Sequence, residues 1–581
     1  MSRVCNKLGE NSPSECAKVA ERGQWVALAL VALVACGVYV NALGNELVYD
    51  DRKLIPANEL MHDPWRVDRI LAGRYWGEIL HSHHYRPLTV WTLAFNYWAN
   101  EFLGLPGAHG VGFHLVNAAL HAGASCALFL LGLRLGLAVH ACTAAALLFA
   151  AHPVHTEAVA FITGRAEPLA MLLGASFLAV HHRGQWKGAG VLYWFALLSK
   201  ESAAVYLCAA LWLDLCTARP LKARWRVYGG YGLVLVGWLL LRQAALGTAD
   251  SDLSALDNPL VNATPLERVL TAATVQFAYL RLLVWPLGLS SDYSHAQIQL
   301  VGDPLDWGVI GFCTAVLIAA GAAWYWWQRS PMVAFVAGSY AILAAPTSNF
   351  LVLVPTIMGE RLIYAPSAAF CLLLGWGLWR LAQRWGWGLW TVGLGLLGSY
   401  AVLTAARNAT WADAETFYRT QFQSAPRSAR AHLGMGRMHA EAGRLDSAQM
   451  YNRSALAIYP NYAMAWYNLG LLQVKRGAWD EALRSYEQAV ALEPAYLKAW
   501  YNLGGVHLQR GEWSEALKAF EQMLILDPEN VGAWNGVGVV HIRQGKLNEA
   551  ARAFARVLVA NPDHEQAQHY LAQVRERLRK Q

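Results

Sequence analysis

Two adjacent carboxylates, Asp50 and Asp51, lie in the stretch YDDRKL, which directly follows the first long apolar run of the chain. A carboxylate at the water-exposed end of a membrane span can act as general base on an acceptor hydroxyl. Its neighbour can then orient the acceptor or help to bind a metal ion. Adjacent acids after a span also occur in helix caps and turns, which is the purely structural alternative. The pair is a catalytic candidate that requires supporting groups elsewhere in the sequence.

Two further pairs of charges interrupt apolar sequence. SKES contains Lys200 and Glu201, and GERLIY contains Glu360 and Arg361. Charges in such surroundings are costly unless they pair with one another or serve a function. One explanation is an internal ion pair that joins helices. The functional hypothesis is that Lys200 and Arg361 neutralise a phosphate group while Glu201 and Glu360 orient them.

A histidine pair, His152 and His155, opens the stretch HPVHTEAVAFITGRAE, and HSHHYRP adds three more histidines. Histidines three residues apart can ligate a metal ion. The proline between the first two indicates the end of a span instead of a regular helix turn. We therefore expect hydrogen-bonding roles for His152 and His155 and predict no metal site for them.

The elements that position these residues belong to a membrane protein. Of the 581 residues, 56% are hydrophobic and only 15% are charged, which is too apolar for a soluble chain of this length. Many of the basic residues behind the net charge of +7 lie in short loops, where they set topology, so the charge does not indicate nucleic-acid binding. The first apolar run is too long for a cleavable signal and is retained as a span. The nine cysteines show no paired spacing.

Basic loops divide the apolar region and predict its topology, because cytoplasmic loops favour Lys and Arg. Two loops on one side require an even number of spans between them. This rule places YDD, HPVHTE, SKES and GERLIY on one non-cytoplasmic face, where we expect a shared cavity. It also demotes residues 265–287 to an interfacial or re-entrant helix and leaves about eleven spans. The Trp-rich stretch after HSHHYRP is expected on the membrane surface, and the C-terminal part outside.

The C-terminal part contains a 34-residue repeat. Pro426, Pro460, Pro494, Pro528 and Pro562 are spaced at this interval, which is the tetratricopeptide period. The fold class is therefore all-α, a polytopic membrane domain followed by an α-solenoid of four repeats. The predicted boundaries are 1–23 for a cytoplasmic segment, 24–405 for the membrane domain, 406–426 for a linker helix, 427–562 for the repeats and 563–581 for a capping helix.

The concave face of two repeats carries a Tyr-Asn pair. Asn can pair with both the donor and the acceptor of an extended peptide backbone, and ordinary polar surface residues are the alternative. The candidate acceptor-binding residues are Tyr467, Asn468, Tyr501 and Asn502.

Taken together, the stretches YDD, YRPLT, HPVHTEAVAFITGRAEPLA, SKES and ERLIYAPS, followed by the repeats, resemble the transmembrane and tetratricopeptide-repeat O-mannosyltransferases and their prokaryotic relatives. These belong to the GT-C glycosyltransferases. The resemblance implies transfer of a sugar from a polyprenyl phosphate to a protein Ser or Thr hydroxyl, with inversion, on the non-cytoplasmic face. It implies that Asp50 or Asp51 is the base and that Lys200 and Arg361 bind the lipid phosphate. Residues implied to line the cavity are Arg86, His152, His155, Glu157, Arg165 and Glu167.

The implied donor is an undecaprenyl or dolichyl phosphate sugar, and the implied partners are the acceptor protein and membrane lipid, without nucleic acid. No cofactor is certain, and a divalent cation at the Asp pair is left open. The excess of Arg over Lys favours a bacterial inner membrane with periplasmic repeats, and the endoplasmic reticulum is the alternative. Two rival functions remain, a non-catalytic scaffold that recruits partners through its repeats and a flippase for the same lipid.

Overall fold

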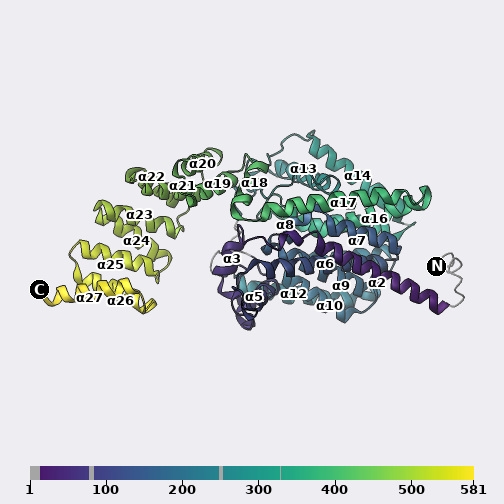
Figure 1. The fold of residues 1–581 in the computed structure, drawn as a ribbon, viewed down its shortest axis with the longest axis horizontal. Coiled ribbons are helices and arrows are strands. Elements are labelled where there is room, and N and C mark those ends of the chain that lie inside the picture. Colours follow the sequence, from purple (N-terminus) through teal and green to yellow (C-terminus); the bar gives the residue numbers. More distant parts are fainter. Residues whose placement is uncertain (1–12, 78–83, 248–252, 328, 581) are drawn as a thin grey trace. The chain divides into compact units, whose positions relative to one another are not determined.

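The structure is a computed structural model, and it describes residues 13–77, 84–247, 253–327 and 329–580. These residues form α-helices and short 3-10 helices, with one isolated bridge between His295 and Ile298 (Figure 1). The all-α prediction is confirmed. The chain divides into two compact units, Met1–Ala425 and Pro426–Gln581, so that the second unit begins at the first of the regularly spaced prolines.

The first unit contains the apolar helices and the predicted site. Its α-helices are α2 (Pro13–Gly37), α3 (Asp51–Ala57), α4 (Val67–Ala72), α5 (Pro87–Phe102), α6 (Gly110–Arg134), α7 (Val139–Ala151), α8 (Thr156–Val159), α9 (Ala166–His182), α10 (Trp186–Ser199), α11 (Tyr206–Cys216), α12 (Trp225–Leu246), α13 (Pro265–Val284), α14 (Trp307–Trp327), α15 (Pro331–Ala344), α16 (Tyr364–Trp385), α17 (Leu389–Asn408) and α18 (Ala414–Ser424). The 3-10 helices are η1 (Val40–Ala42), η2 (Glu59–Met61), η3 (Pro153–His155), η4 (Ile162–Arg165), η5 (Glu201–Val205), η6 (Leu221–Arg224), η7 (Pro259–Asn262), η8 (Ala345–Thr347), η9 (Glu360–Ile363) and η10 (Ala409–Trp411).

Within the described residues, six helices are long and apolar enough to cross a membrane, as expected of a multi-pass membrane protein. They are Glu21–Ala42, Gly110–Arg134, Leu221–Leu246, Trp307–Trp327, Glu360–Trp385 and Leu389–Trp411. Pro153–Val159 and Ile162–His182 pass the same test as a pair bent by 102°, which makes up to seven. Val139–Ala151 and Pro331–Thr347 are shorter apolar helices. The predicted number of about eleven therefore stays a prediction.

Several helices are short because they end at the polar motifs. α7 ends just before His152, α10 ends just before Lys200, and α11 starts after the 3-10 helix that contains Glu201. The backbone leaves the α-helix at each of these places, so side chains from the motif are presented at a helix end. α9, α10 and α16 each have a polar motif at one end and basic residues at or just beyond the other, which matches the alternation predicted from the loops.

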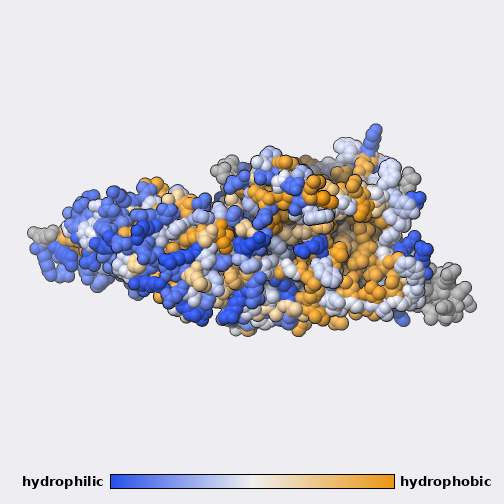
Figure 2. All heavy atoms as spheres, turned by 90° about the horizontal axis from the view of Figure 1, so that it is seen from above, coloured by the Kyte–Doolittle hydropathy of each residue, from blue (hydrophilic) through white to orange (hydrophobic). Residues whose placement is uncertain are grey.

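Two helices predicted to lie at the interface are not among the candidate spans of the described chain. α5 forms the Trp-rich helix of the first loop, and α13 begins with a capping box between Thr264 and Glu267. Apolar side chains cover much of the visible face of the first unit in orange, whereas blue polar side chains dominate the repeats (Figure 2). This division agrees with a membrane part and a water-exposed part.

The second unit consists of four helix pairs and a final helix. The pairs are α19 (Ala429–Glu441) with α20 (Leu445–Ile458), α21 (Ala463–Lys475) with α22 (Trp479–Leu492), α23 (Leu497–Arg510) with α24 (Trp513–Leu526), and α25 (Val531–Arg543) with α26 (Leu547–Ala560); α27 (Glu565–Lys580) follows. The indole N–H groups of Trp466, Trp500 and Trp534 donate to the carbonyls of Pro460, Pro494 and Pro528 at 2.8–2.9 Å. The repeated proline thus supplies the acceptor that fixes the start of each helix pair.

Candidate active site

The four polar stretches predicted on one face come together in the first unit. The Asp51 carboxylate is buried and accepts the backbone N–H groups of Ile162 and Thr163 at 3.1 and 2.9 Å, from the turn that contains GRAE. Burial raises the pKa of Asp51 to about 8, an effect reduced by these two N–H donors and increased by the charge of Asp50. Asp51 therefore joins the first loop to the second motif and is poorly placed to act as a base.

Asp50 lies one residue earlier and is only partly buried. Its side chain makes no capping hydrogen bond to α3, whereas its carbonyl accepts the N–H groups of Lys53 and Leu54 at 3.1 and 2.8 Å. The helix-cap explanation thus applies to its backbone and not to its carboxylate. Tyr49, just before it, has a φ of +52°, a left-handed conformation that is unusual for an aromatic residue. The backbone therefore turns at Tyr49, between the first span and α3.

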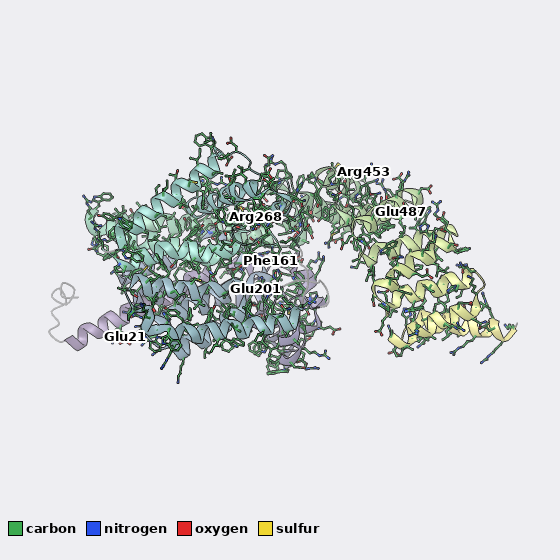
Figure 3. All side chains as sticks on the ribbon, turned by 180° about the vertical axis from the view of Figure 1, so that it is seen from behind. Glu21, Phe161, Glu201, Arg268, Arg453 and Glu487 are labelled. Atoms are coloured by element: carbon green, nitrogen blue, oxygen red, sulfur yellow. The ribbon has the colours of Figure 1, made fainter. Side chains whose placement is uncertain are left out.

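Lys200 forms a buried ion pair with Glu167, which joins SKES to the second motif. Its sequence neighbour Glu201 faces elsewhere. The Glu201 carboxylate accepts the backbone N–H of Tyr85 and the Arg86 guanidinium, each at 2.9 Å, and thereby joins SKES to YRPLT (Figure 3 labels Glu201). The prediction that Glu201 orients Lys200 is wrong. Lys200 has extended backbone dihedrals at the end of α10, so adjacent side chains point in different directions.

Where Glu201 contacts the first loop, polar side chains of that loop form a small cluster. The His84 ring lies 3.7 Å from Glu201 and 3.3 Å from the Arg86 guanidinium. Arg86 also lies over the Tyr75 ring, 5.3 Å from its centroid. Burial alone would raise the pKa of Glu201, but Arg86 and His84 outweigh it and keep that pKa well below its usual range. Glu201 is thus a permanent carboxylate that fixes Arg86.

Arg361 joins the GERLIY stretch to HPVHTE. Its backbone N–H donates to Glu157 at 3.0 Å, and its guanidinium lies 3.2 Å from the other oxygen of the same carboxylate. The Arg361 side chain is 38% exposed, whereas that of Lys200 is 8% exposed, so Arg361 is the more accessible cation. Its charge interacts with Glu157 most strongly and then with Asp50 and Glu167. The candidate base and the candidate phosphate ligand therefore share one electrostatic environment.

Glu360 does not orient Arg361, which corrects a second predicted pairing. Its fully buried carboxylate accepts the backbone N–H of Ser290 and the Tyr293 hydroxyl, and it lies 3.5 Å from Arg407. It therefore connects the loop after α13 with α17. The η9 helix begins at Glu360, directly after the extended residue Gly359. Because a 3-10 helix turns by about 120° per residue, the side chains of Glu360 and Arg361 point in different directions.

The histidines of HPVHTE are buried and bind backbone carbonyls. His152 contacts the Leu283 carbonyl at 3.0 Å, and His155 contacts the Phe149 carbonyl at 2.8 Å and the Ser367 hydroxyl at 2.8 Å. Both have the hydrogen-bonding roles expected from the sequence. His81 and His83 lie outside the described residues. Because both Asp51 oxygens already accept N–H donors, the Asp pair fits a divalent cation poorly.

Arg165, predicted to line the cavity, is fully buried in protein. Within the described part of the chain, its guanidinium donates to four neutral acceptors at 2.6–3.0 Å: the side chains of Asn117 and Asn96 and the carbonyls of Thr92 and Phe113. It fixes the GRAE turn against α5 and α6. Asn117 and Arg407 were missed by the sequence analysis, although a polar Asn in the apolar run HLVNAAL is a recognisable signal.

In the repeats, the predicted acceptor-binding pairs have different surroundings. The Asn502 amide donates to the Tyr467 hydroxyl at 3.1 Å, which links two successive repeats. Tyr501 is 45% exposed, and Asn468 is partly exposed. Tyr467 also packs against the Tyr496 ring at a centroid distance of 5.0 Å. Of the four residues, Asn468 and Tyr501 are the more available to a ligand.

Comparison with known proteins gives the same domain combination. The family described as "Protein O-mannosyl-transferase TMTC, DUF1736" matches residues 247–320, which contain α13 and the first two thirds of α14, and "Tetratricopeptide repeat" matches 467–531, 506–565 and 537–580. Human protein O-mannosyl-transferase TMTC4 is 27% identical over 493 residues, covering 74% of this chain and 65% of the human protein.

Two invertebrate relatives are equally similar. A Caenorhabditis elegans protein O-mannosyl-transferase is 27% identical over 453 residues, covering 76% of this chain and 63% of the relative. Drosophila melanogaster Tmtc1 is 27% identical over 531 residues, covering 74% and 61%. The chain thus spans less than two thirds of the length of these relatives. It is a TMTC-like multi-pass membrane protein, in which a TMTC DUF1736 domain is joined to tetratricopeptide repeats.

Proposed function

We propose that this protein transfers a sugar, with mannose as the first candidate, from a polyprenyl phosphate to a Ser or Thr hydroxyl of a protein acceptor. The observation that carries the proposal is the convergence of Asp50 and Arg361 on one cluster, fixed by the Asp51, Glu157, Glu167 and Glu201 contacts. The names of the relatives support mannose and a protein acceptor. The predicted topology supports the non-cytoplasmic face.

The proposed step is a single displacement at the anomeric carbon. The acceptor oxygen forms a bond to that carbon, the bond from carbon to the phosphate oxygen breaks with its electron pair, and the configuration inverts. The acceptor proton passes to the Asp50 carboxylate, and the lipid phosphate leaves as an anion. Asp50 is preferred over Asp51 because Asp51 is buried and already accepts two backbone N–H groups.

The leaving phosphate requires cations at membrane depth. Arg361 offers a partly exposed guanidinium, of which Nη1 is engaged by Glu157, and other N–H donors can bind phosphate oxygens. Lys200 is buried against Glu167 and contributes a nearby positive charge without being as accessible. The donor lipid is undecaprenyl phosphate in a bacterium, with periplasmic repeats, or dolichyl phosphate in the endoplasmic reticulum. The repeats bind the acceptor through the Asn468 and Tyr501 region.

The test is an activity assay on the purified full chain. Mannosyl phospholipids with undecaprenyl and dolichyl chains are incubated with the protein and candidate acceptor proteins, and glycosylation is detected by mass spectrometry. Asp50→Asn should abolish transfer, while Glu59→Gln, at an exposed acid of the same loop, should not. Full transfer activity of Asp50→Asn would exclude Asp50 as the base, and acceptor binding without any transfer by the native protein would favour the scaffold. Lipid movement between leaflets without transfer would favour the flippase.

A further inference from the structure

The surface between α6 and α9 contains an open groove at a distance from the candidate site. Its volume is about 270 Å³, and its walls are apolar or small side chains that include Leu130, Leu172 and Val180. Gly123 lies at one end, and Arg134 and Arg183 lie at the other. Between Gly123 and Arg134 α6 rises by about 16 Å, roughly half of the ~30 Å hydrocarbon core of a bilayer. The groove is thus one leaflet long.

The groove narrows where the two helices come closest. A methyl group added at Gly123 would lie 3.3 Å from the nearer side-chain methyl of Leu172. Ala127 forms a buried floor, while Leu130 is 39% exposed and Ser176 is partly exposed. A long, open and mostly apolar depression between two apolar helices fits an extended hydrocarbon chain.

The charges at the groove end specify the headgroup. Arg134 is in the last turn of α6, Arg183 directly follows α9, and both side chains are exposed. Among the described residues neither forms an ion pair. Topology alone explains why Arg occurs at these helix ends, but not why two of them border one apolar groove. Two guanidinium groups can bind the oxygens of one phosphate.

We propose that this groove binds an anionic glycerophospholipid, with one acyl chain between α6 and α9 and the phosphate between Arg134 and Arg183. The site lies at the basic end of both helices, whereas α9 begins at the GRAE motif at its other end. It is therefore separate from the candidate active site, and its existence does not depend on sugar transfer. Under the predicted topology it faces the cytoplasmic leaflet.

Native mass spectrometry of the detergent-purified full chain tests the proposal. Phosphatidylglycerol, phosphatidylcholine with the same acyl chains, and undecaprenyl phosphate are added separately. We expect retention of one phosphatidylglycerol in preference to phosphatidylcholine. Arg134→Gln combined with Arg183→Gln should weaken that binding about tenfold, the factor that corresponds to roughly 1.4 kcal/mol. Ser176→Phe, which fills the groove and keeps both arginines, should weaken it as well.

The matched control is Arg380→Gln combined with Arg384→Gln, which removes two exposed charges from the end of α16, outside the groove. This variant should retain the lipid. The proposal fails if both double variants lose it equally, because attraction would then be nonspecific. It also fails if the Arg134 and Arg183 variant binds normally, or if undecaprenyl phosphate outcompetes phosphatidylglycerol at this groove. Melting temperatures identify any variant that does not fold, and Ala179→Leu then replaces Ser176→Phe.

Discussion

Glu157 binds Arg361 at two points, with one oxygen 3.0 Å from the backbone N–H and the other 3.2 Å from the guanidinium. One carboxylate thus fixes both the backbone and the side chain of the most accessible cation in the cluster. Arg361 could therefore be either a structural partner of Glu157 or a ligand for phosphate that Glu157 holds in position. Variants at Arg361 and Glu157 distinguish these two roles.

Arg361→Ala should weaken donor-lipid binding by roughly 30- to 1,000-fold, which corresponds to about 2–4 kcal/mol for a charge-assisted contact. Arg361→Lys should recover part of the loss, because an ammonium group lacks the planar fork. Acceptor binding should be unchanged. Donor affinity, acceptor affinity and melting temperature are measured on the same protein.

Arg361→Ala also leaves the nearly buried Glu157 carboxylate without its cation, at a cost of about 1–3 kcal/mol in folding free energy. Adding Glu157→Gln to Arg361→Ala should recover thermal stability and leave donor binding weak. If the double variant also regains donor binding, Arg361 is structural and does not contact the lipid.

Substitutions of Asp50 and Asp51 should have different effects on turnover and on stability. Asp50→Asn should lower turnover by about 10²–10⁴-fold with little change in melting temperature, because an amide is a poor base. Asp51→Asn should instead destabilise the fold by about 1–3 kcal/mol, because its NH₂ group faces a backbone N–H in place of an acceptor oxygen. Paired turnover and thermal unfolding measurements decide this. Equal loss of turnover with no loss of stability in both variants contradicts the assignment.

Stability should depend on pH through Asp51. Its pKa in the folded protein is raised to about 8 from an ordinary value of 3.8, so the folded state binds the proton more tightly than the unfolded state. The contribution to stability is therefore complete below pH 4, decreases as the pH rises, and is lost above about 8. The slope is at most about 1.4 kcal/mol per pH unit. Comparing the melting temperatures of the native protein and Asp51→Asn from pH 5 to 9 isolates the contribution of Asp51. Parallel profiles of the two proteins would show that Asp51 does not cause the pH dependence.

The repeats offer a test of acceptor binding. Asn468→Ala and Tyr501→Ala should weaken binding of an extended acceptor peptide, whereas Asn535→Ala, which removes a contact with Gln566 outside the Tyr-Asn pairs, should not. Tyr467→Phe should cost about 0.5–1.5 kcal/mol of stability, because it removes the acceptor of the Asn502 amide. Peptide affinity by calorimetry and thermal unfolding distinguish the two roles. Unchanged affinity in both Asn468→Ala and Tyr501→Ala would leave the pairs as surface residues.

Topology is tested by thiol labelling in a cysteine-free background. A cysteine at the exposed Gln509 should react with a membrane-impermeant reagent in intact cells or vesicles of native orientation, and one at the exposed Lys222 should react only after permeabilisation. The reverse pattern would place the repeats on the cytoplasmic side.

The sequence predicted the repeats well because each 34-residue unit contains its own markers. The proline carbonyl accepts the Trp indole N–H, and the turn glycines Gly443, Gly477, Gly511 and Gly545 have φ of 74–76°. Ala448, Ala482, Ala516 and Ala550 recur at the same 34-residue interval and are fully buried. These are local requirements, visible in a single chain. The meeting of YDD, HPVHTE, SKES and GERLIY was also predictable, because loop charge and span parity place whole segments, whereas the contact of SKES with YRPLT was not predicted in this way.

The pairing of individual side chains was not predictable in the same way. Lys200 pairs with Glu167 and not Glu201, and Arg361 pairs with Glu157 and not Glu360. Sequence neighbours were favoured because they are close along the chain, but the extended and 3-10 backbone at these helix ends turns adjacent side chains apart. The ion-pair partner of each cation is determined by how helices that are distant in the sequence pack together. The periodicity of the sequence gives no information about that packing.

The buried Arg165 has a consequence beyond fixing its turn. Its donors are satisfied by neutral acceptors, so hydrogen bonding does not cancel its charge, and in a medium of low dielectric constant that charge creates a potential that extends past contact distance. Asp51 and Tyr75 both experience it. Arg165 therefore places a fixed positive charge behind the YDD turn, where it partly offsets the acidic side chains of that turn. A charge held in this way acts on the groups of the site through its field, without any contact between them and Arg165.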